Sequence, residues 1–152
     1  MALSYDNIFY DYCLDPLRDL FITEYNYGKI YIAPEILHKD PFSIRIWGKE
    51  TSTHQYVATG WQKQYDVEIV LYSIESNPGE KYYQQLYRDS ERIYQLLFNN
   101  KAKETTVNSV SRSWIDGVCE GFEINEYDND EDEIEGLNLA RFNFNCKIMR
   151  NN

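Results

Sequence analysis

The fold is decided by YDVEIVLYSI at residues 65–74, followed after Asn77-Pro78-Gly79 by EKYYQQLYRDSERIYQLLFN at residues 80–99. In the first segment apolar residues alternate with polar ones, until Val70 and Tyr72 make the second face apolar as well. This pattern predicts a strand that lies inside a sheet or beneath a helix. The second segment predicts one long amphipathic helix, because apolar or small residues recur every three or four positions at Tyr83, Leu86, Ser90, Ile93 and Leu97.

Other strands are predicted on both sides of this pair. Residues 29–33 and 42–46 are short apolar runs, the second with period two. Residues 114–127 form a longer run in which Gly117 and Gly121 predict bulges or close packing. Residues 141–148 alternate cleanly, so the last two runs predict an antiparallel pair with an acidic segment between them.

The N-terminal region predicts helix. Ser4 could cap it, and Ile8, Phe9, Tyr12 and Cys13 share one face at helical spacing. Asp15-Pro16 then interrupts the pattern. Either Asp15 caps a second short helix that begins at Pro16, or one helix continues with a kink.

Two stretches are polar. Residues 101–113 have few apolar side chains and predict a connecting loop. Residues 48–64 are rich in Thr, Ser and Gln, with Tyr56 and Trp61 among them. They predict either an ordinary flexible hairpin or a β-arm that adds to a neighbour's sheet edge, in which case Tyr56 and Trp61 are interface candidates.

Taken together, residues 1–152 are expected to form one α+β domain. Its mostly antiparallel β-sheet would be covered by an N-terminal helix and one long central helix, and β-hairpins would protrude from it.

The charge of the chain is concentrated in one place. The net charge is −10, and residues 116–135 contain ten acidic residues and no Lys or Arg. Such a block repels nucleic acid, which basic patches bind. Asp128, Asp130 and Asp132 have the spacing of a calcium loop, but Glu133 replaces the glycine that the loop requires, so a solvated acidic tip is favoured. The tip also supplies interface candidates for a basic partner: Asp128, Asp130, Glu131 and Asp132.

The sequence contains no recognisable catalytic motif. The chain has three scattered cysteines, two histidines at positions 38 and 54, and none of the common nucleophile, phosphate-loop or zinc motifs. We therefore expect no enzyme activity, no cofactor and no metal. We also expect no membrane partner, because no signal peptide or long apolar run occurs. The cysteines suit a reducing compartment such as the cytosol.

The order of elements resembles the tail-terminator (tail-completion) proteins of tailed bacteriophages. The matching segments are an N-terminal helix, a strand pair with a polar arm, a long helix after a Pro-Gly turn, and a closing strand pair, at residues 4–21, 42–74, 80–99 and 114–148. The likeness is one of layout, size and acidity.

This resemblance implies a structural virion protein of the tail and neck, assembled in the host cytoplasm. Six copies would form a ring on the last ring of the tail tube, and the ring would contact the tail tube protein and a neck or connector protein. DNA would only pass through the lumen. An acidic surface that faced such a channel would repel DNA, but the sequence leaves open whether residues 116–135 face the lumen or the outside. The alternatives are another neck adaptor or a tail-tube subunit, an acidic protein-binding module, or a small enzyme whose carboxylates the sequence does not reveal.

Overall fold

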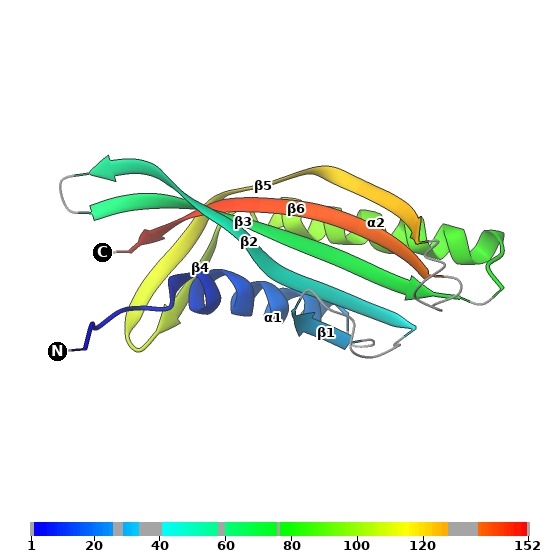
Figure 1. The fold of residues 1–152 in the computed structure, drawn as a ribbon, viewed down its shortest axis with the longest axis horizontal. Coiled ribbons are helices and arrows are strands. Elements are labelled where there is room, and N and C mark those ends of the chain that lie inside the picture. Colours follow the sequence, from blue (N-terminus) through cyan, green and yellow to red (C-terminus); the bar gives the residue numbers. More distant parts are fainter. Residues whose placement is uncertain are drawn as a thin grey trace.

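One twisted six-stranded sheet organises the chain (Figure 1). The structure, a computed structural model, describes residues 2–25, 29–33, 41–57, 60–75, 77–127 and 137–151, with backbone alone for 54–57, 60–62, 126 and 127. Its elements, in chain order, are η1 Tyr10–Leu14, α1 Asp15–Glu24, β1 Lys29–Ile32, β2 Phe42–Val57, β3 Gly60–Ile74, α2 Glu80–Asn99, β4 Lys103–Val107, β5 Val110–Tyr127 and β6 Leu137–Arg150.

The strand order in the sheet is β1-β2-β3-β6-β5-β4. β1 runs parallel to β2, and every other neighbouring pair is antiparallel. The long strands β2, β3, β6 and β5 therefore alternate in direction across the centre of the sheet. The predicted α+β class with a mostly antiparallel sheet and two helices is confirmed.

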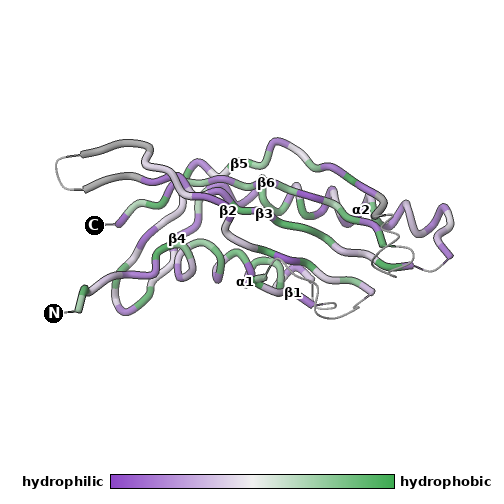
Figure 2. Tube along the Cα trace, viewed as in Figure 1, coloured by the Kyte–Doolittle hydropathy of each residue, from purple (hydrophilic) through white to green (hydrophobic). Residues whose placement is uncertain are grey.

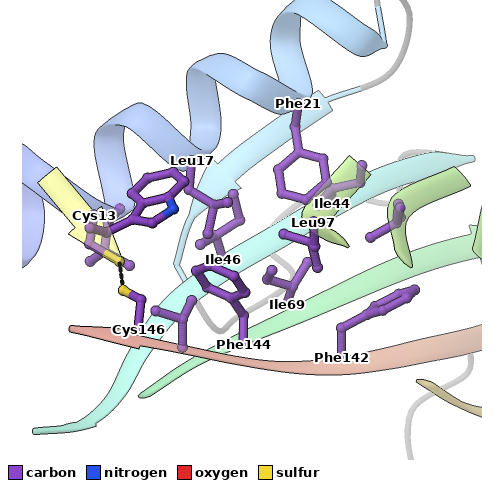
Figure 3. Close-up of a cluster of buried hydrophobic side chains, with 14 of the residues drawn as sticks. Cys13, Leu17, Phe21, Ile44, Ile46, Ile69, Leu97, Phe142, Phe144 and Cys146 are labelled. Carbon is purple, nitrogen blue, oxygen red and sulfur yellow. Dashed lines mark hydrogen bonds between the residues drawn. The ribbon is translucent and has the colours of Figure 1, made fainter. Parts of the chain in front are cut away.

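Both helices contribute to one hydrophobic core on one face of the sheet. Figure 3 shows side chains of η1 and α1, among them Leu17 and Phe21, lying over the strand residues Ile46 and Phe144. Leu97 of α2 is buried in the same core. Hydrophobic and hydrophilic bands alternate along α2 in Figure 2, as the sequence periodicity predicts.

The opposite face carries a smaller buried cluster at one end of the sheet, made of Val70, Tyr72, Leu137 and Leu139. This cluster explains why the central strand β3 is apolar on both faces. Beside it, the buried guanidinium of Arg45 lies 4.2 Å from the ring centroid of Tyr31. The rest of this second face is polar, and we call it the open face.

The N-terminal helical region is one continuous helix with an irregular turn. Of the two predicted alternatives, the helix that continues through Asp15-Pro16 is confirmed, and the second helix capped by Asp15 is wrong. Leu14 and Asp15 both have helical backbone angles, and the Asp15 N–H bonds to the carbonyl of Tyr10, five residues back. This π-turn accommodates Pro16, which has no N–H to give to the preceding turn. Ser4 does not cap the helix, because the first helical residue is Ile8.

The loop predicted at residues 101–113 is also wrong. β4 and the start of β5 form an edge hairpin there, in the register Lys103↔Trp114 to Val107↔Val110. The turn residues Asn108 and Ser109 have φ of 50° and 66°, the signature of a tight type I′ turn. No residue of β4 is fully buried on either face of the sheet, so the strand lacks the apolar pattern by which strands are recognised.

Candidate functional site

A polar hollow of about 510 Å³ lies on the open face, across β3, β6 and β5. Its charged lining comprises Lys49, Glu68, Glu120, Glu123 and Arg141, and the amides of Asn143 and Asn145 complete its floor. The hollow lies on this face because the helices cover the other one, and because strand residues alternate between the two faces.

Ion pairs cross the open face between neighbouring strands. Arg141 Nη1 donates to Glu68 Oε1 at 3.0 Å, and Lys147 Nζ lies 3.5 Å from Asp116 Oδ2. Pairs of this kind, partly open to water, stabilise a fold by about 0–1 kcal/mol each. Their main effect is to neutralise the two basic residues, so the remaining acids on β5 dominate the local charge.

Two bulges in β5 set the direction of those acids. The register of β5 with β6 shifts between Ile115 and Val118 and again between Cys119 and Phe122. Asp116 has φ of 52° and Gly121 has φ of 155°, the second a conformation that favours glycine. The bulges leave the acids at Asp116, Glu120 and Glu123 exposed to solvent. The predicted bulges in this strand are confirmed.

Long parts of two strands form open sheet edges. β1 covers the outer edge of β2 only from Ser43 to Ile46, and β4 covers the outer edge of β5 only from Val110 to Trp114. Beyond those points, no strand in the described part of the chain pairs with the outer edges of β2 or β5. Unpaired backbone N–H and C=O groups on such edges are ready sites for strand addition.

The structure places few of the predicted interface residues. Tyr56 lies near the end of β2 and Trp61 near the start of β3, where they are opposite each other in the strand pairing, and their side chains lie outside the described residues. The four predicted acids Asp128, Asp130, Glu131 and Asp132 lie wholly outside the described residues. The polar stretch that contains Tyr56 belongs to the continuous strand β2, whose outer edge is open from Trp47.

One buried carboxyl group with a raised pKa lies away from the open face. Burial raises the pKa of Asp89 on α2, while a hydrogen bond from Gln85 and the nearby guanidinium of Arg92 oppose the shift. Asp89 is on the side of α2 that meets α1, since the Tyr25 hydroxyl donates to its carbonyl oxygen at 3.2 Å. Within the described residues, no group of three or more His, Cys, Asp or Glu side chains is close enough to hold a metal ion.

None of the described helices has the length and apolar character needed to cross a lipid bilayer. No protein-family model matches this chain, and no curated protein matches it.

The three cysteines are free thiols in contrasting surroundings. Cys13 and Cys146 are fully buried, with their sulfur atoms 3.9 Å apart between η1 and β6 (Figure 3). The contact with Cys13, followed by burial, raises the pKa of the Cys146 thiol strongly. Cys119 on β5 is half-buried, and burial raises its pKa more modestly.

We therefore expect iodoacetamide to label only Cys119 in the folded protein. The thiolate is the reactive form, so labelling should be slow at neutral pH and accelerate as pH rises toward the raised pKa of Cys119. Mass spectrometry after timed labelling measures this, with Cys119→Ser as the control that removes the signal. Rapid labelling of Cys13 or Cys146 without unfolding would contradict the packing of η1 on β6.

Proposed function

We propose that this chain is a structural virion protein, a tail terminator that works by assembling with copies of itself and not by turning over a substrate. Six copies would form a ring on the last ring of the tail tube, stop further tube growth and present a surface to the neck or connector. The proposal rests on the order of elements and on one geometric observation, the open outer edge of β2.

This edge runs from Trp47 to Val57, beyond the last residue of β2 that β1 covers. Over the same length the inner edge of β2 is paired with β3. In Figure 1 the paired ends of β2 and β3 extend past the two helices. We infer that this strand pair is a protruding arm, and that its outer edge adds to the sheet of the next subunit.

A contact of this type is heterologous, because the arm of one subunit meets a different surface on the next. Heterologous contacts repeated by rotation close into a ring, whereas a contact between identical surfaces stops at a dimer. The acidic residues exposed on β5 would repel DNA wherever they face a channel, which suits a ring through which a genome only passes.

A shortened-arm variant tests the proposal. In this variant Asn-Gly replaces residues 53–63, so that a type I′ turn joins Ser52 to Gln64, which are already paired in the register of β2 and β3. The buried strand residues from Tyr65 onward are unchanged. We expect a folded protein that no longer assembles, measured by circular dichroism and sedimentation velocity.

Ile22→Ala is the matched control, because Ile22 is an exposed apolar residue of α1, distant in sequence from the arm. It should assemble as the unmodified protein does. A shortened-arm variant that forms the same oligomer as the unmodified protein would overturn the role of the arm.

An acidic protein-binding module is the second candidate, favoured by the exposed acids of β5 in a block of sequence without Lys or Arg. A neck adaptor or a tail-tube subunit would use the same kind of subunit contact. Electron microscopy of the purified protein separates these readings. Single rings support a terminator, long tubes a tube subunit, and isolated monomers the binding module.

A further inference from the structure

An aromatic stripe runs along one side of α2. Tyr83, Tyr87, Tyr94 and Phe98 follow one another at spacings of four, seven and four residues, which places them on one face of a helix. Tyr83 and Tyr94 are half-buried against the core, whereas Tyr87 and Phe98 are 56% and 55% exposed. Large aromatic side chains exposed in a row on a helix are typical of a protein interface.

The stripe faces the β5 side of the molecule. Tyr94 packs on Phe122 of β5 with ring centroids 6.4 Å apart. The opposite side of α2 meets α1, through Asp89 and through Arg92, whose Nε lies 2.6 Å from the Glu24 carboxylate. Tyr87 and Phe98 therefore extend toward the outer edge of β5, away from α1.

The C-terminal end of the stripe is held next to the part of β5 at which its outer edge loses its partner strand. Lys101 Nζ lies 3.9 Å from the ring centroid of Phe98, and the Lys101 carbonyl accepts a 2.8 Å hydrogen bond from the N–H of Gly117. From Val118 onward, the outer edge of β5 has no partner strand among the described residues. A free strand edge and an exposed aromatic stripe thus lie side by side.

We propose that this edge and stripe are the acceptor for the arm of a second copy of this chain. The inference rests on the proposed ring and names the surface that receives the arm. The free edge of β2 would pair with β5 from Val118 to Tyr127. Side chains on the helix-facing side of the added strand would pack against Tyr87 and Phe98.

The length of the aromatic stripe agrees with the lengths of the two free strand edges. Tyr87 and Phe98 are about 16 Å apart along the helix axis, at 1.5 Å per residue. A strand covers that distance in about five residues. Both free edges, Trp47–Val57 and Val118–Tyr127, are longer than this, so one arm can contact both aromatic residues at once.

Strand direction favours a second copy as the occupant. β2 and β5 run in opposite directions in the sheet, because three antiparallel pairings separate them. When a second copy is rotated about a ring axis to which the strands are tilted, as in a barrel, its β2 therefore lies antiparallel to the first copy's β5. The alternation of strands then continues from one subunit to the next.

The short edge strands determine how the copies are offset. β1 blocks one end of the β2 edge and β4 blocks the opposite end of the β5 edge. The neighbour must therefore slide along the strand direction before the free parts meet. Strands that are tilted to the ring axis provide this stagger by rotation alone, as in a closed barrel, so the ring can still close.

The charges of the arm and of the β5 edge also favour a second copy of this chain as the occupant. Between Trp47 and Gln64 the arm contains two lysines and a single acid, Glu50. Along this edge β5 exposes Glu120 and Glu123 and has no basic residue after Arg112. The basic residue at the end of the acceptor, Lys101, lies against the ring of Phe98. The basic residue Arg141 on β6 is two strand spacings from an added strand, about 10 Å, where salt screens most of its repulsion.

The test uses two variants of the full chain. The acceptor variant is Tyr87→Ala with Phe98→Ala, two exposed positions whose truncation leaves the core intact. The donor variant is the shortened arm, which keeps the acceptor. We expect the acceptor variant to raise the subunit dissociation constant at least about 100-fold, as removal of two interface aromatics typically does. The control Ile22→Ala should leave it unchanged.

Mixing the two variants gives the sharper result. Each variant alone should be monomeric, while an equal mixture should form a one-to-one dimer and nothing larger, because only one intact donor and one intact acceptor remain per pair. Native mass spectrometry distinguishes the two chains by mass. A dimer has one interface for two subunits, whereas a closed ring has one for every subunit, so the mixture needs a higher concentration than the ring does. A mixture that stays monomeric even at concentrations far above the one at which the unmodified protein assembles would overturn the proposed pairing.

The two proposals fail in different ways. If the unmodified protein is a monomer at every concentration, the ring itself is wrong. If the unmodified protein forms rings and the acceptor variant forms the same rings, the ring stands and the acceptor assignment is wrong, and the edge of β5 then serves another partner.

Discussion

Trp114→Ala is expected to lower the free energy of unfolding by about 3–5 kcal/mol, the range for deleting a large aromatic from a core. The Trp114 side chain is fully buried and meets Phe144 edge to face, with centroids 5.9 Å apart. Its Nε1 donates a 2.9 Å hydrogen bond to the carbonyl of Asn100, directly after α2. The substitution therefore opens a cavity and also removes the bond that joins the end of α2 to β5.

Trp114→Phe separates these two contributions. It keeps an aromatic ring but leaves the Asn100 carbonyl without its donor, which should cost about 1–3 kcal/mol. Urea unfolding followed by circular dichroism, at one fixed protein concentration, measures both variants. A loss below about 1 kcal/mol for Trp114→Ala would show that α2 is not anchored on β5 as described.

Gly117→Ala is expected to give the second large effect, a loss of about 1–3 kcal/mol from overpacking. A Cβ at this position would lie 2.9 Å from the backbone oxygen of Lys101 and 2.9 Å from a ring carbon of Phe144. Neither neighbour can move easily, because the oxygen belongs to the backbone and the ring of Phe144 is buried in the core. The hydrogen bond from Gly117 to Lys101 would be strained as well.

Two other glycines serve as matched controls. At Gly48 a Cβ would lie 2.7 Å from the ring of Phe9, a half-buried side chain near the N-terminus that can move aside. At Gly79, the N-cap of α2, nothing lies within 4 Å of the added atom. The expected order of destabilisation by alanine is Gly117, then Gly48, then Gly79, measured in the same unfolding experiment. A loss at Gly79 larger than at Gly117 would contradict the packing of β5.

The parts of the fold with a clear period could be predicted from sequence. The alternation around Ile69 identified the central strand, and the three-and-four spacing through Leu97 identified α2, because in both cases one face is buried and the other is wet. The bulges at Gly117 and Gly121 were also predicted, since glycine inside a strand weakens it unless the backbone needs the space or the angle.

The errors have physical causes. β4 was missed because an edge strand needs backbone pairing and a tight turn at Asn108-Ser109 more than it needs apolar side chains. The sequence left two alternatives for the N-terminal helix, because Asp15-Pro16 is also a strong helix-start signal and no local rule shows that a π-turn will accommodate the proline.

Most of the candidate site could not be predicted either. The open edge of β5 depends on where β4 ends, which is a property of the whole sheet. The aromatic stripe of α2 did leave a signal, because Tyr87 and Phe98 continue the spacing of Tyr83 and Tyr94. Sequence alone assigns such residues to the core, and only the exposure of Tyr87 and Phe98 in the structure shows that they lie outside it.

The mass of the intact assembly in solution tests the central claim most directly. Native mass spectrometry of the unmodified protein should show one closed species of six subunits, each of 18.1 kDa, whereas the shortened-arm variant should show single subunits only. A protein that remains a single 18.1 kDa subunit at high concentration would contradict the claim that this chain works through contacts between its own copies.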